Sequence, residues 1–329
     1  MKICFYALRE FDELKYCEQY KKQYGIDYIY TTEYPSPENI VLAEGCDAVS
    51  MTPCDMSEPM VKGFHEIGIK YITCRSIGYD HVSLETARRY NMKVSNVSYL
   101  PDGVANYAIM LMMMCTRRMA HIMKRAELQD YSLKNKLGRD ISHCVIGIIG
   151  TGKIGATVIR HLAGFGSRIL AYDPYENEEL KEVAEYTDLD TLLEKADVIS
   201  LHMNATEKNY HMINRETIGK MKSGVILINT ARGKLIDTEA LIEGIKTGRI
   251  GGAGLDVLEN ENGLYYCNRM GENIVNDTMA ILKSFPNVIL SPHTAFYTEE
   301  DVRDMVKGCF ESVDGFAKGI RTVHEIRLS

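Results

Sequence analysis

Short apolar runs alternate with amphipathic stretches along the first hundred residues of the chain. The apolar runs are rich in β-branched and aromatic residues, whereas the stretches between them repeat apolar positions at helical spacing. Alternation of this kind is typical of a doubly wound parallel sheet. The pattern predicts strands at Ile3–Ala7, Asp27–Tyr30, Asp47–Ser50, Lys70–Cys74 and Lys93–Ser95, and helices over Asp12–Gln23, Glu58–Ile67 and Leu84–Tyr90.

A second series of the same kind follows a long apolar helix that we predict over Val104–Glu127. Its six strands with helical crossovers have the size of a full dinucleotide-binding domain. The strands are predicted at Cys144–Ile149, Arg168–Tyr172, Val198–His202, Val225–Asn229, Gly252–Val257 and Val288–Leu290, and the helices over Ile154–Phe165, Leu189–Lys195, Arg215–Met221 and Thr238–Thr247.

A length of 329 residues is that of about two domains. A last amphipathic stretch, Thr298–Lys318, predicts a helix that packs back on the first domain. We therefore expect residues 1–100 and 299–329 to form one domain and residues 101–298 the other. The predicted fold is α/β, with two doubly wound parallel-sheet domains and a cleft between them.

Composition narrows the class of protein without identifying it. The formal net charge is −7, from 38 basic and 45 acidic side chains, and predicts no nucleic-acid or anionic-membrane partner. Nine scattered cysteines without a C-x-x-C pair predict reduced thiols, no metal site and a cytoplasmic location. The N-terminal apolar run is too short for a signal peptide. The apolar run Val104–Met114 is too short to span a bilayer and predicts a buried helix.

A glycine-rich loop supplies the first candidate site. The residues Gly150–Gly155 read G-T-G-K-I-G, follow the apolar run Val145–Ile149 and open a helical pattern at Ile154. Glycines in this context permit a tight turn and close approach of the backbone to a pyrophosphate, which the helix N-terminus attracts. The alternative is a glycine-rich turn that binds no ligand.

The next predicted strand ends at Asp173, 18 residues after Gly155. A carboxylate at this place can accept hydrogen bonds from the ribose hydroxyls of the adenosine and would repel a 2′-phosphate, which favours NAD over NADP. Arg168 lies at the opposite end of that strand and cannot receive a 2′-phosphate there. The alternative is an exposed turn aspartate before Pro174.

Three residues suited to hydride-transfer chemistry follow later strands, where a parallel sheet binds its ligands. The Arg232 guanidinium can hold a substrate carboxylate through two hydrogen bonds. The His293 imidazole can give a proton to a keto oxygen. Glu261 can orient that imidazole and would raise its pKa. Asp256 could contact the carboxamide of the cofactor or support the site.

Each of these residues taken singly could be a surface ion pair or a loop residue, so their convergence carries the prediction. Most of the other histidines are expected to be solvated or satisfied by the backbone. They are His65, His81, His121, His143, His161, His202, His211 and His324.

Five stretches are specific enough for comparison with known families. They are Arg75–Asp80 (RSIGYD), Gly150–Gly155, Asn229–Gly233 (NTARG), Gly254–Glu261 (GLDVLENE) and Ser291–Thr298 (SPHTAFYT). With these motifs the chain resembles, over nearly its whole length, the D-isomer-specific 2-hydroxyacid dehydrogenases. The resemblance is greatest to the D-lactate dehydrogenase branch, including the type found in vancomycin-resistance operons. It implies a Rossmann-like NAD domain (residues 101–298) and a flavodoxin-like substrate domain.

The resemblance also implies roles for individual residues. The catalytic residues would be Arg232, Glu261 and His293. The cofactor would contact Gly150, Gly152, Lys153, Ile154, Gly155, Asp173, His202, Thr230, Ala231 and Asp256. The substrate carboxylate would bind the backbone N–H groups of Ile77 and Gly78, and the substrate side chain would lie among Met51, Tyr99, Phe296 and Tyr297.

Family members are usually dimers built on the long helix, and the helix starting near Val104 fits that role, although a purely intramolecular core helix is an equal alternative. The chain departs from the family pattern at Met203–Thr206, where a proline is usual, and at Asn106, where an acidic residue is common.

The predicted function is NADH-dependent reduction of a small 2-keto acid to the D-2-hydroxy acid. We expect acceptance of pyruvate and of bulkier apolar acids such as 2-ketoisocaproate or phenylpyruvate. A dicarboxylate such as 2-ketoglutarate is not expected, because Met51 offers it no positive charge. The alternatives are a phosphoglycerate- or glyoxylate-type dehydrogenase of the same fold and a non-catalytic, NAD-sensing binding protein.

Overall fold

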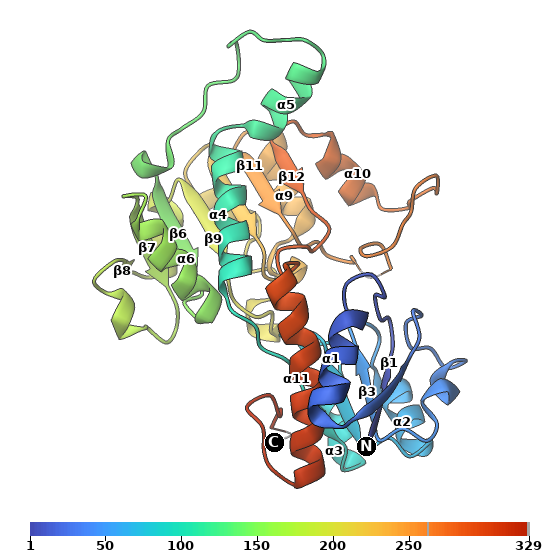
Figure 1. Cartoon of the computed structure of the whole chain (residues 1–329). Coiled ribbons are helices and arrows are strands. Elements are labelled where there is room, and N and C mark those ends of the chain that lie inside the picture. The colour runs from blue at the N-terminus through green and yellow to red at the C-terminus, as the bar shows by residue number, and fades with distance from the viewer. Residues whose placement is uncertain (262, 328–329) are drawn as a thin grey trace. The chain divides into compact units, whose positions relative to one another are not determined.

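The computed structural model of the chain describes residues 1–261 and 263–327. The chain forms two compact units, Met1–Leu100 with Tyr297–Ser329, and Pro101–Phe296 (Figure 1). Each unit is built on one sheet of parallel strands with helices packed on it. The predicted α/β class with two doubly wound sheets is therefore confirmed.

The first unit has a five-stranded sheet in the order β2-β1-β3-β4-β5, which is the flavodoxin-like order. Its strands are β1 (Lys2–Phe5), β2 (Asp27–Tyr30), β3 (Ala48–Met51), β4 (Tyr71–Cys74) and β5 (Lys93–Ser95). Its helices are α1 (Leu14–Tyr24), α2 (Glu58–Glu66), α3 (Leu84–Arg89) and α11 (Glu299–Lys318), with a 3-10 turn η1 (Ile40–Ala43).

The inner strands β1, β3 and β4 of this sheet are largely apolar and almost entirely buried because helices cover both of its faces. Two consecutive side chains, the last one of β1 and the one that follows it, illustrate the two sides. Phe5 packs against Phe310 of α11, with ring centroids 5.7 Å apart. Tyr6, its neighbour, packs against Phe64 of α2, with centroids 5.6 Å apart. The helix α11 also packs on α1 and β4, so the last helix of the chain completes the first unit.

The second unit has a seven-stranded sheet in the order β12-β11-β10-β9-β6-β7-β8. Its strands are β6 (Val145–Ile149), β7 (Arg168–Tyr172), β8 (Glu185–Tyr186), β9 (Val198–Leu201), β10 (Val225–Asn229), β11 (Ile250–Leu255) and β12 (Val288–Leu290). Its α-helices are α4 (Asp102–Thr116), α5 (Met119–Glu127), α6 (Lys153–Ala163), α7 (Leu189–Lys195), α8 (Arg215–Lys220), α9 (Thr238–Lys246) and α10 (Asp277–Ser284). Short 3-10 turns are η2 (Ile141–His143), η3 (Glu178–Leu180), η4 (Glu207–Asn209) and η5 (Gly233–Leu235).

The predicted count of six strands for this unit was wrong, because the sheet has a further edge strand, β8. Two residues are too few to show a periodicity, so the pattern of the sequence contains no signal for this strand. The helix α10 was also not predicted.

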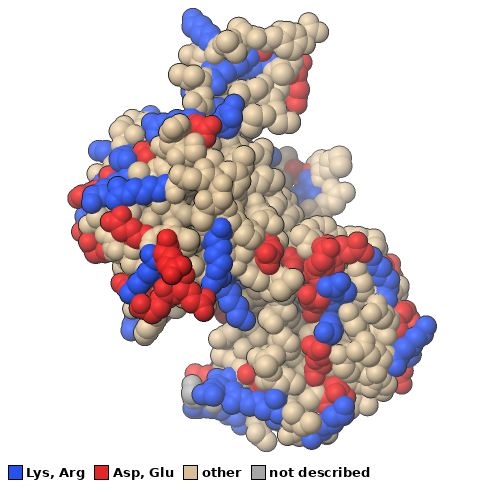
Figure 2. Space-filling view, turned by 60° about the vertical axis from the view of Figure 1, so that its left-hand side comes forward, with Lys and Arg blue, Asp and Glu red and all other residues tan. Residues whose placement is uncertain are grey.

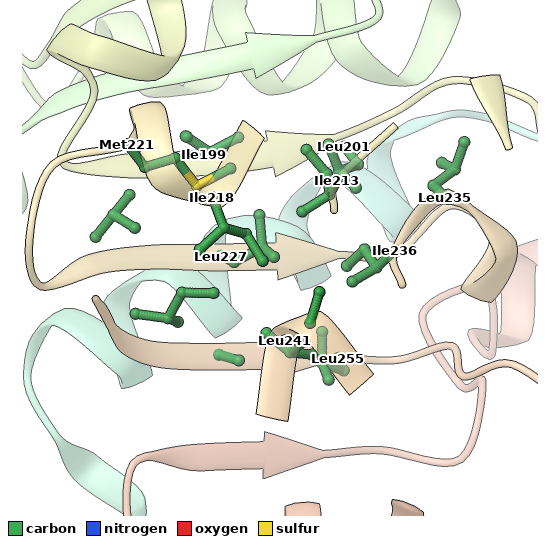
Figure 3. Close-up of a cluster of buried hydrophobic side chains, with 14 of the residues drawn as sticks. Ile199, Leu201, Ile213, Ile218, Met221, Leu227, Leu235, Ile236, Leu241 and Leu255 are labelled. Carbon is green, nitrogen blue, oxygen red and sulfur yellow. The ribbon is translucent and has the colours of Figure 1, made fainter. Parts of the chain in front are cut away.

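Two apolar cores enclose the second sheet. Side chains of β9, β10 and β11 pack on one face with those of α7, α8 and α9, including Leu227, Ile218 and Leu241 (Figure 3). On the other face, residues of β6 and β7 pack with those of α4 and α6. The sheet is thereby held rigidly, and the loops at its carboxyl edge start from fixed positions.

The helix predicted over Val104–Glu127 consists of two helices, so that prediction was wrong in its extent. The break falls between α4 and α5, where Arg118 adopts a left-handed conformation with φ 56°. One side of α4 lies in the core, where Leu111 and Met112 are buried. By contrast, α5 has no buried residue. None of the helices in the described part of the chain has an apolar stretch long enough to cross a bilayer.

Candidate active site

The predicted cofactor and catalytic residues of the second unit follow the strands of its sheet. Gly150 follows β6, Asp173 follows β7, Thr230 follows β10 and Asp256 follows β11, with His293 shortly after β12. Because the strands are parallel, these residues lie at one edge of the sheet. The strand order reverses between β6 and β9, which is where open α/β sheets bind nucleotides.

The glycine loop has the close backbone contacts that a dinucleotide site requires. Gly150 has φ 95°, a conformation that side chains rarely allow. A Cβ added to Gly155 would lie 1.9 Å from the carbonyl oxygen of Gly150, so only glycine lets α6 pack this close to the loop. Gly152 precedes the first turn of α6, and a Cβ there would meet no atom within 4 Å. The approach to the helix N-terminus is therefore open.

Asp173 is fixed beside this loop by two hydrogen bonds. Its Oδ2 accepts the backbone N–H of Thr151 at 2.7 Å, and its Oδ1 accepts that of Tyr175 at 2.9 Å. The hydroxyl of Tyr186 donates to Thr151 Oγ1 at 2.8 Å. The carboxylate and the glycine loop thus form one rigid structure.

The turn that carries Arg232 is braced by the last residue of β10. The Asn229 side chain accepts the N–H of Ala231 at 3.0 Å and donates to the carbonyl of Arg232 at 2.9 Å. The Arg232 guanidinium donates from Nη1 to the carbonyl of Ala231 at 2.8 Å. In the same turn, Thr230 Oγ1 is buried without a hydrogen-bond partner among the described residues. A buried hydroxyl of this kind suits a contact with a bound cofactor.

Glu261 and His293 form a direct pair. The Oε1 atom of Glu261 lies 2.5 Å from Nδ1 of His293, and both side chains are only about one-fifth exposed. The second oxygen of Glu261 accepts the N–H of Leu258 at 2.8 Å. Glu261 therefore contacts one ring nitrogen of His293, Nδ1, and fixes the orientation of the imidazole.

Asp256 holds the turn in which His293 lies. This carboxylate is fully buried, and it accepts hydrogen bonds from Ser291 Oγ at 2.6 Å and from the N–H groups of Thr294 and Ala295 at 2.9 Å each. The N–H of His293 donates to the carbonyl of Asp256 at 2.8 Å. His293 has φ 54°, an uncommon conformation that these bonds maintain.

His202 follows β9 at the same edge of the sheet. Its Nε2 atom lies 2.9 Å from Ser200 Oγ. Burial lowers the pKa of His202 to about 4, because the charged imidazolium would lose its hydration. The ring is therefore neutral at neutral pH.

Comparisons with known proteins agree with this geometry. The family model described as D-isomer specific 2-hydroxyacid dehydrogenase, NAD binding domain, matches residues 109–295. An aromatic 2-oxoacid reductase of Clostridium sporogenes is 41% identical over 312 residues, which are 93% of this chain and 93% of that protein. The D-lactate dehydrogenase of Escherichia coli K12 is 35% identical over 329 residues, which are 99% of this chain and 100% of that protein.

Among solved structures, the NAD-complexed form of a D-isomer specific 2-hydroxyacid dehydrogenase from Lactobacillus delbrueckii ssp. bulgaricus matches with a TM-score of 0.85 and 31% identity. The match covers 99% of this chain and 100% of that chain. The chain belongs to the D-isomer-specific 2-hydroxyacid dehydrogenase family. Membership of this family gives the reaction class and the cofactor. It is an NAD-dependent enzyme that interconverts 2-keto acids and D-2-hydroxy acids, as predicted.

The remaining predicted substrate residues of this dehydrogenase lie mainly in the first unit. Met51 ends β3 and is fully buried. The carbonyls of Ile77 and Gly78 accept hydrogen bonds from Asn96 and Ser76 respectively, which shapes the loop after β4. Tyr99 is half-buried and comes shortly after β5. These residues stay predictions for substrate binding.

Phe296 and Tyr297, the two aromatic residues predicted to lie beside the substrate side chain, differ in their surroundings. In the second unit, the Phe296 ring lies 6.4 Å from the His293 imidazole, edge to face. In the first unit, the Tyr297 hydroxyl donates to the carboxylate of Asp12, and the guanidinium of Arg9 lies 5.5 Å from its ring. The Tyr297 hydroxyl therefore already has an acceptor.

Sequence reasoning missed two groups of the dehydrogenase. The Tyr266 hydroxyl donates to the carbonyl of His293 at 3.0 Å, from a loop that has no regular pattern. The other group is the side-chain pair of His211, which was predicted only together with seven other histidines to be mostly solvated or satisfied by backbone; its Nε2 lies 2.7 Å from Glu259. The described residues contain no group of three or more His, Cys, Asp or Glu that could hold a metal ion.

Proposed function

We propose that this dehydrogenase reduces 2-keto acids with apolar side chains, from pyruvate to phenylpyruvate, and that Arg232, Glu261 and His293 carry the chemistry. The observation that carries the proposal is the close pair of Glu261 and His293, 2.5 Å apart at the carboxyl edge of the NAD-binding sheet. A histidine held in this way can present one nitrogen to a reacting oxygen.

The cofactor fits the residues that are present. The glycine loop can approach a pyrophosphate, Asp173 lies beside that loop, and the unpartnered hydroxyl of Thr230 is available. When bound, NADH supplies the hydride. Arg232 would bind the substrate carboxylate through its planar guanidinium and so orient the 2-keto carbon.

The proposed proton transfer follows from the contact between Glu261 and His293. As hydride adds to the keto carbon, the protonated His293 gives its Nε2 proton to the keto oxygen, and the product is the 2-hydroxy acid. Glu261 stabilises the imidazolium before the transfer and keeps the ring from rotating. The neutral imidazole then regains a proton from solvent.

The charged residues of the first unit support a preference for substrates with apolar side chains. The two arginines at the carboxyl edge of its sheet are already paired: Arg75 lies 3.0 Å from Glu13 with both side chains fully buried, and Arg9 lies 2.9 Å from Asp12. Both guanidinium charges are therefore compensated by carboxylates of the chain itself, which disfavours a second substrate carboxylate, while Nη2 of Arg9 is buried without a hydrogen-bond partner among the described residues. The similarity to an aromatic 2-oxoacid reductase and to a D-lactate dehydrogenase is consistent with this range.

The test is NADH oxidation by the purified enzyme with pyruvate, 2-ketoisocaproate, phenylpyruvate and 2-ketoglutarate, followed by chiral analysis of the products. We expect D products, and the highest kcat/KM with an apolar acid. A higher kcat/KM with 2-ketoglutarate would contradict the substrate assignment. NADH binding without turnover of any acid would favour a binding protein instead.

We also propose that the enzyme is a homodimer that uses α4 and the segment after it. Although one side of α4 is buried, Met110 and Met113 on its outer side are 40% exposed. Large apolar side chains continue along the following segment, where Leu133 and Leu137 are almost fully exposed. Such side chains are costly to leave in water. Light scattering should show a dimer for the wild type and a monomer for Leu133→Asp/Leu137→Asp.

A cytoplasmic location is proposed on the state of the cysteines. All nine are free, and burial raises the pKa of Cys54 and of Cys115 to about 12, so these thiols are unreactive. On the face shown in Figure 2, basic and acidic side chains are interspersed and do not form separate basic and acidic faces. Cell fractionation with antibody detection tests the location, and recovery in the membrane or secreted fraction would contradict it.

A further inference from the structure

The structure contains a second histidine–glutamate pair, and its glutamate lies in the same loop as Glu261. Nε2 of His211 is 2.7 Å from Oε1 of Glu259, which comes two residues before Glu261. The two side chains are 27% and 20% exposed, much like those of Glu261 and His293. Neither member of the second pair is among the residues proposed to bind substrate or cofactor.

The other oxygen of Glu259 is also occupied. Oε2 accepts the hydroxyl of Thr238 at 2.6 Å and its backbone N–H at 3.2 Å. Thr238 is the first residue of α9, where a negative charge is stabilised by the free N–H groups of the helix. Glu259 therefore connects its own loop to two other elements.

His211 is itself held from several sides. Its N–H donates to the carbonyl of Lys234 at 2.9 Å, and its carbonyl accepts from the Asn214 side chain at 3.0 Å. Its ring stacks on that of Tyr210, with centroids 3.9 Å apart. The chain continues alongside η5, where Ile213 lies beside Leu235 (Figure 3).

This segment is the continuation of the turn that carries Arg232. A Cβ added to the next residue, Gly233, would lie 2.1 Å from the carbonyl carbon of Leu258 and 2.5 Å from the nitrogen of Glu259. The Arg232 turn and the Glu261 loop are thus in direct backbone contact. The contact between the side chains of His211 and Glu259 joins the same two segments a second time.

We infer that His211 and Glu259 are positioning residues that fix the Arg232 turn relative to the loop of Glu261 and His293. The inference rests on the proposed roles of those three residues. Without the contact between His211 and Glu259, the loop keeps the Leu258–Gly233 contact and the bonds of Glu259 to Thr238, but it loses its attachment to the segment of His211 beside η5. Carboxylate binding and proton transfer then lose their mutual alignment, to which catalysis is highly sensitive.

His211→Asn is the variant for the test. His211 has φ 50°, a conformation that asparagine tolerates better than most residues, and the shorter side chain cannot reach Glu259. We expect kcat/KM for the preferred 2-keto acid to fall about tenfold, with a raised KM and a lowered kcat, the size of one lost hydrogen bond to a charged group. The Kd for NADH should not change. The exposed His143 provides a matched control, and His143→Asn should behave as wild type.

A double-mutant cycle with His293→Ala separates positioning from general stabilisation. If His211 acts through the proton-transfer pair, His211→Asn should have little further effect on the low residual turnover of His293→Ala. An equal loss in both backgrounds, or unchanged kcat/KM in His211→Asn alone, would overturn the inference. Absence of turnover in the wild type would instead contradict the proposed function.

Discussion

Replacing Gly155 with alanine would place a methyl group inside the cofactor loop. The added Cβ would lie 1.9 Å from the carbonyl oxygen of Gly150 and 3.3 Å from Cβ of His202. Cβ atoms essentially never come within 3.0 Å of a heavy atom to which they are not bonded. The loop or α6 must therefore move by about 1 Å or more. The obstructing atom is backbone, so no side-chain rotation can relieve the clash.

Forced insertion of atoms into a packed region typically costs about 1–3 kcal/mol, and a clash with rigid backbone belongs at the upper end. For a domain of this size, about 3 kcal/mol lowers the Tm by roughly 6–12 °C. The displaced loop also carries the N–H groups proposed to face the pyrophosphate. We therefore expect the Kd for NADH to rise by tenfold or more in Gly155→Ala.

Gly152→Ala is the matched control because its Cβ meets nothing within 4 Å in the unliganded protein. Its backbone has φ −63°, which alanine adopts without strain. We expect an unchanged Tm but a weaker affinity for NADH, since the methyl group would stand where the pyrophosphate approaches. Thermal melts and NADH fluorescence titrations measure both quantities. A wild-type Tm for Gly155→Ala would refute the packing argument, and wild-type NADH affinity for Gly152→Ala would refute the proposed binding mode.

Three further outcomes are expected. Arg232→Lys should raise the KM for the 2-keto acid strongly, because an ammonium group cannot reproduce the planar fork, and an unchanged KM would exclude Arg232 as the carboxylate ligand. Asp173→Asn keeps an acceptor for the Thr151 N–H but removes the charge, so the preference of kcat/KM for NADH over NADPH should fall about tenfold, whereas Asp173→Glu should retain it. The unfolded state protonates His202 near pH 6.5 and the folded state near pH 4, so stability should decrease as the pH falls through this interval, by at most about 3 kcal/mol. In urea titrations, His202→Asn should flatten that decrease, and an equal decrease in both proteins would assign it to other groups.

Much of the fold could be predicted from the sequence because its strands are short, apolar and separated by amphipathic helices. The strands at Asp27–Tyr30 and Val225–Asn229 have the bounds that the pattern predicts. The pattern failed where the chain has no local signal. Neither the left-handed conformation of the exposed Arg118, which separates α4 from α5, nor the two-residue strand β8, which pairs with β7, leaves a periodic pattern in the sequence.

By itself the sequence determined the α/β class, the glycine loop, and the placement of Asp173, Arg232 and His293 after parallel strands, because apolar periodicity and motif spacing are local properties. The residue types also suggested that Glu261 orients His293, and the structure pairs the two side chains. Only the tertiary structure decided how the other carboxylates are used, because Asp256 braces the turn around His293 and Glu259 pairs with His211, 48 residues away in the sequence. Each of these contacts depends on which strands are neighbours in the sheet and how closely their loops pack.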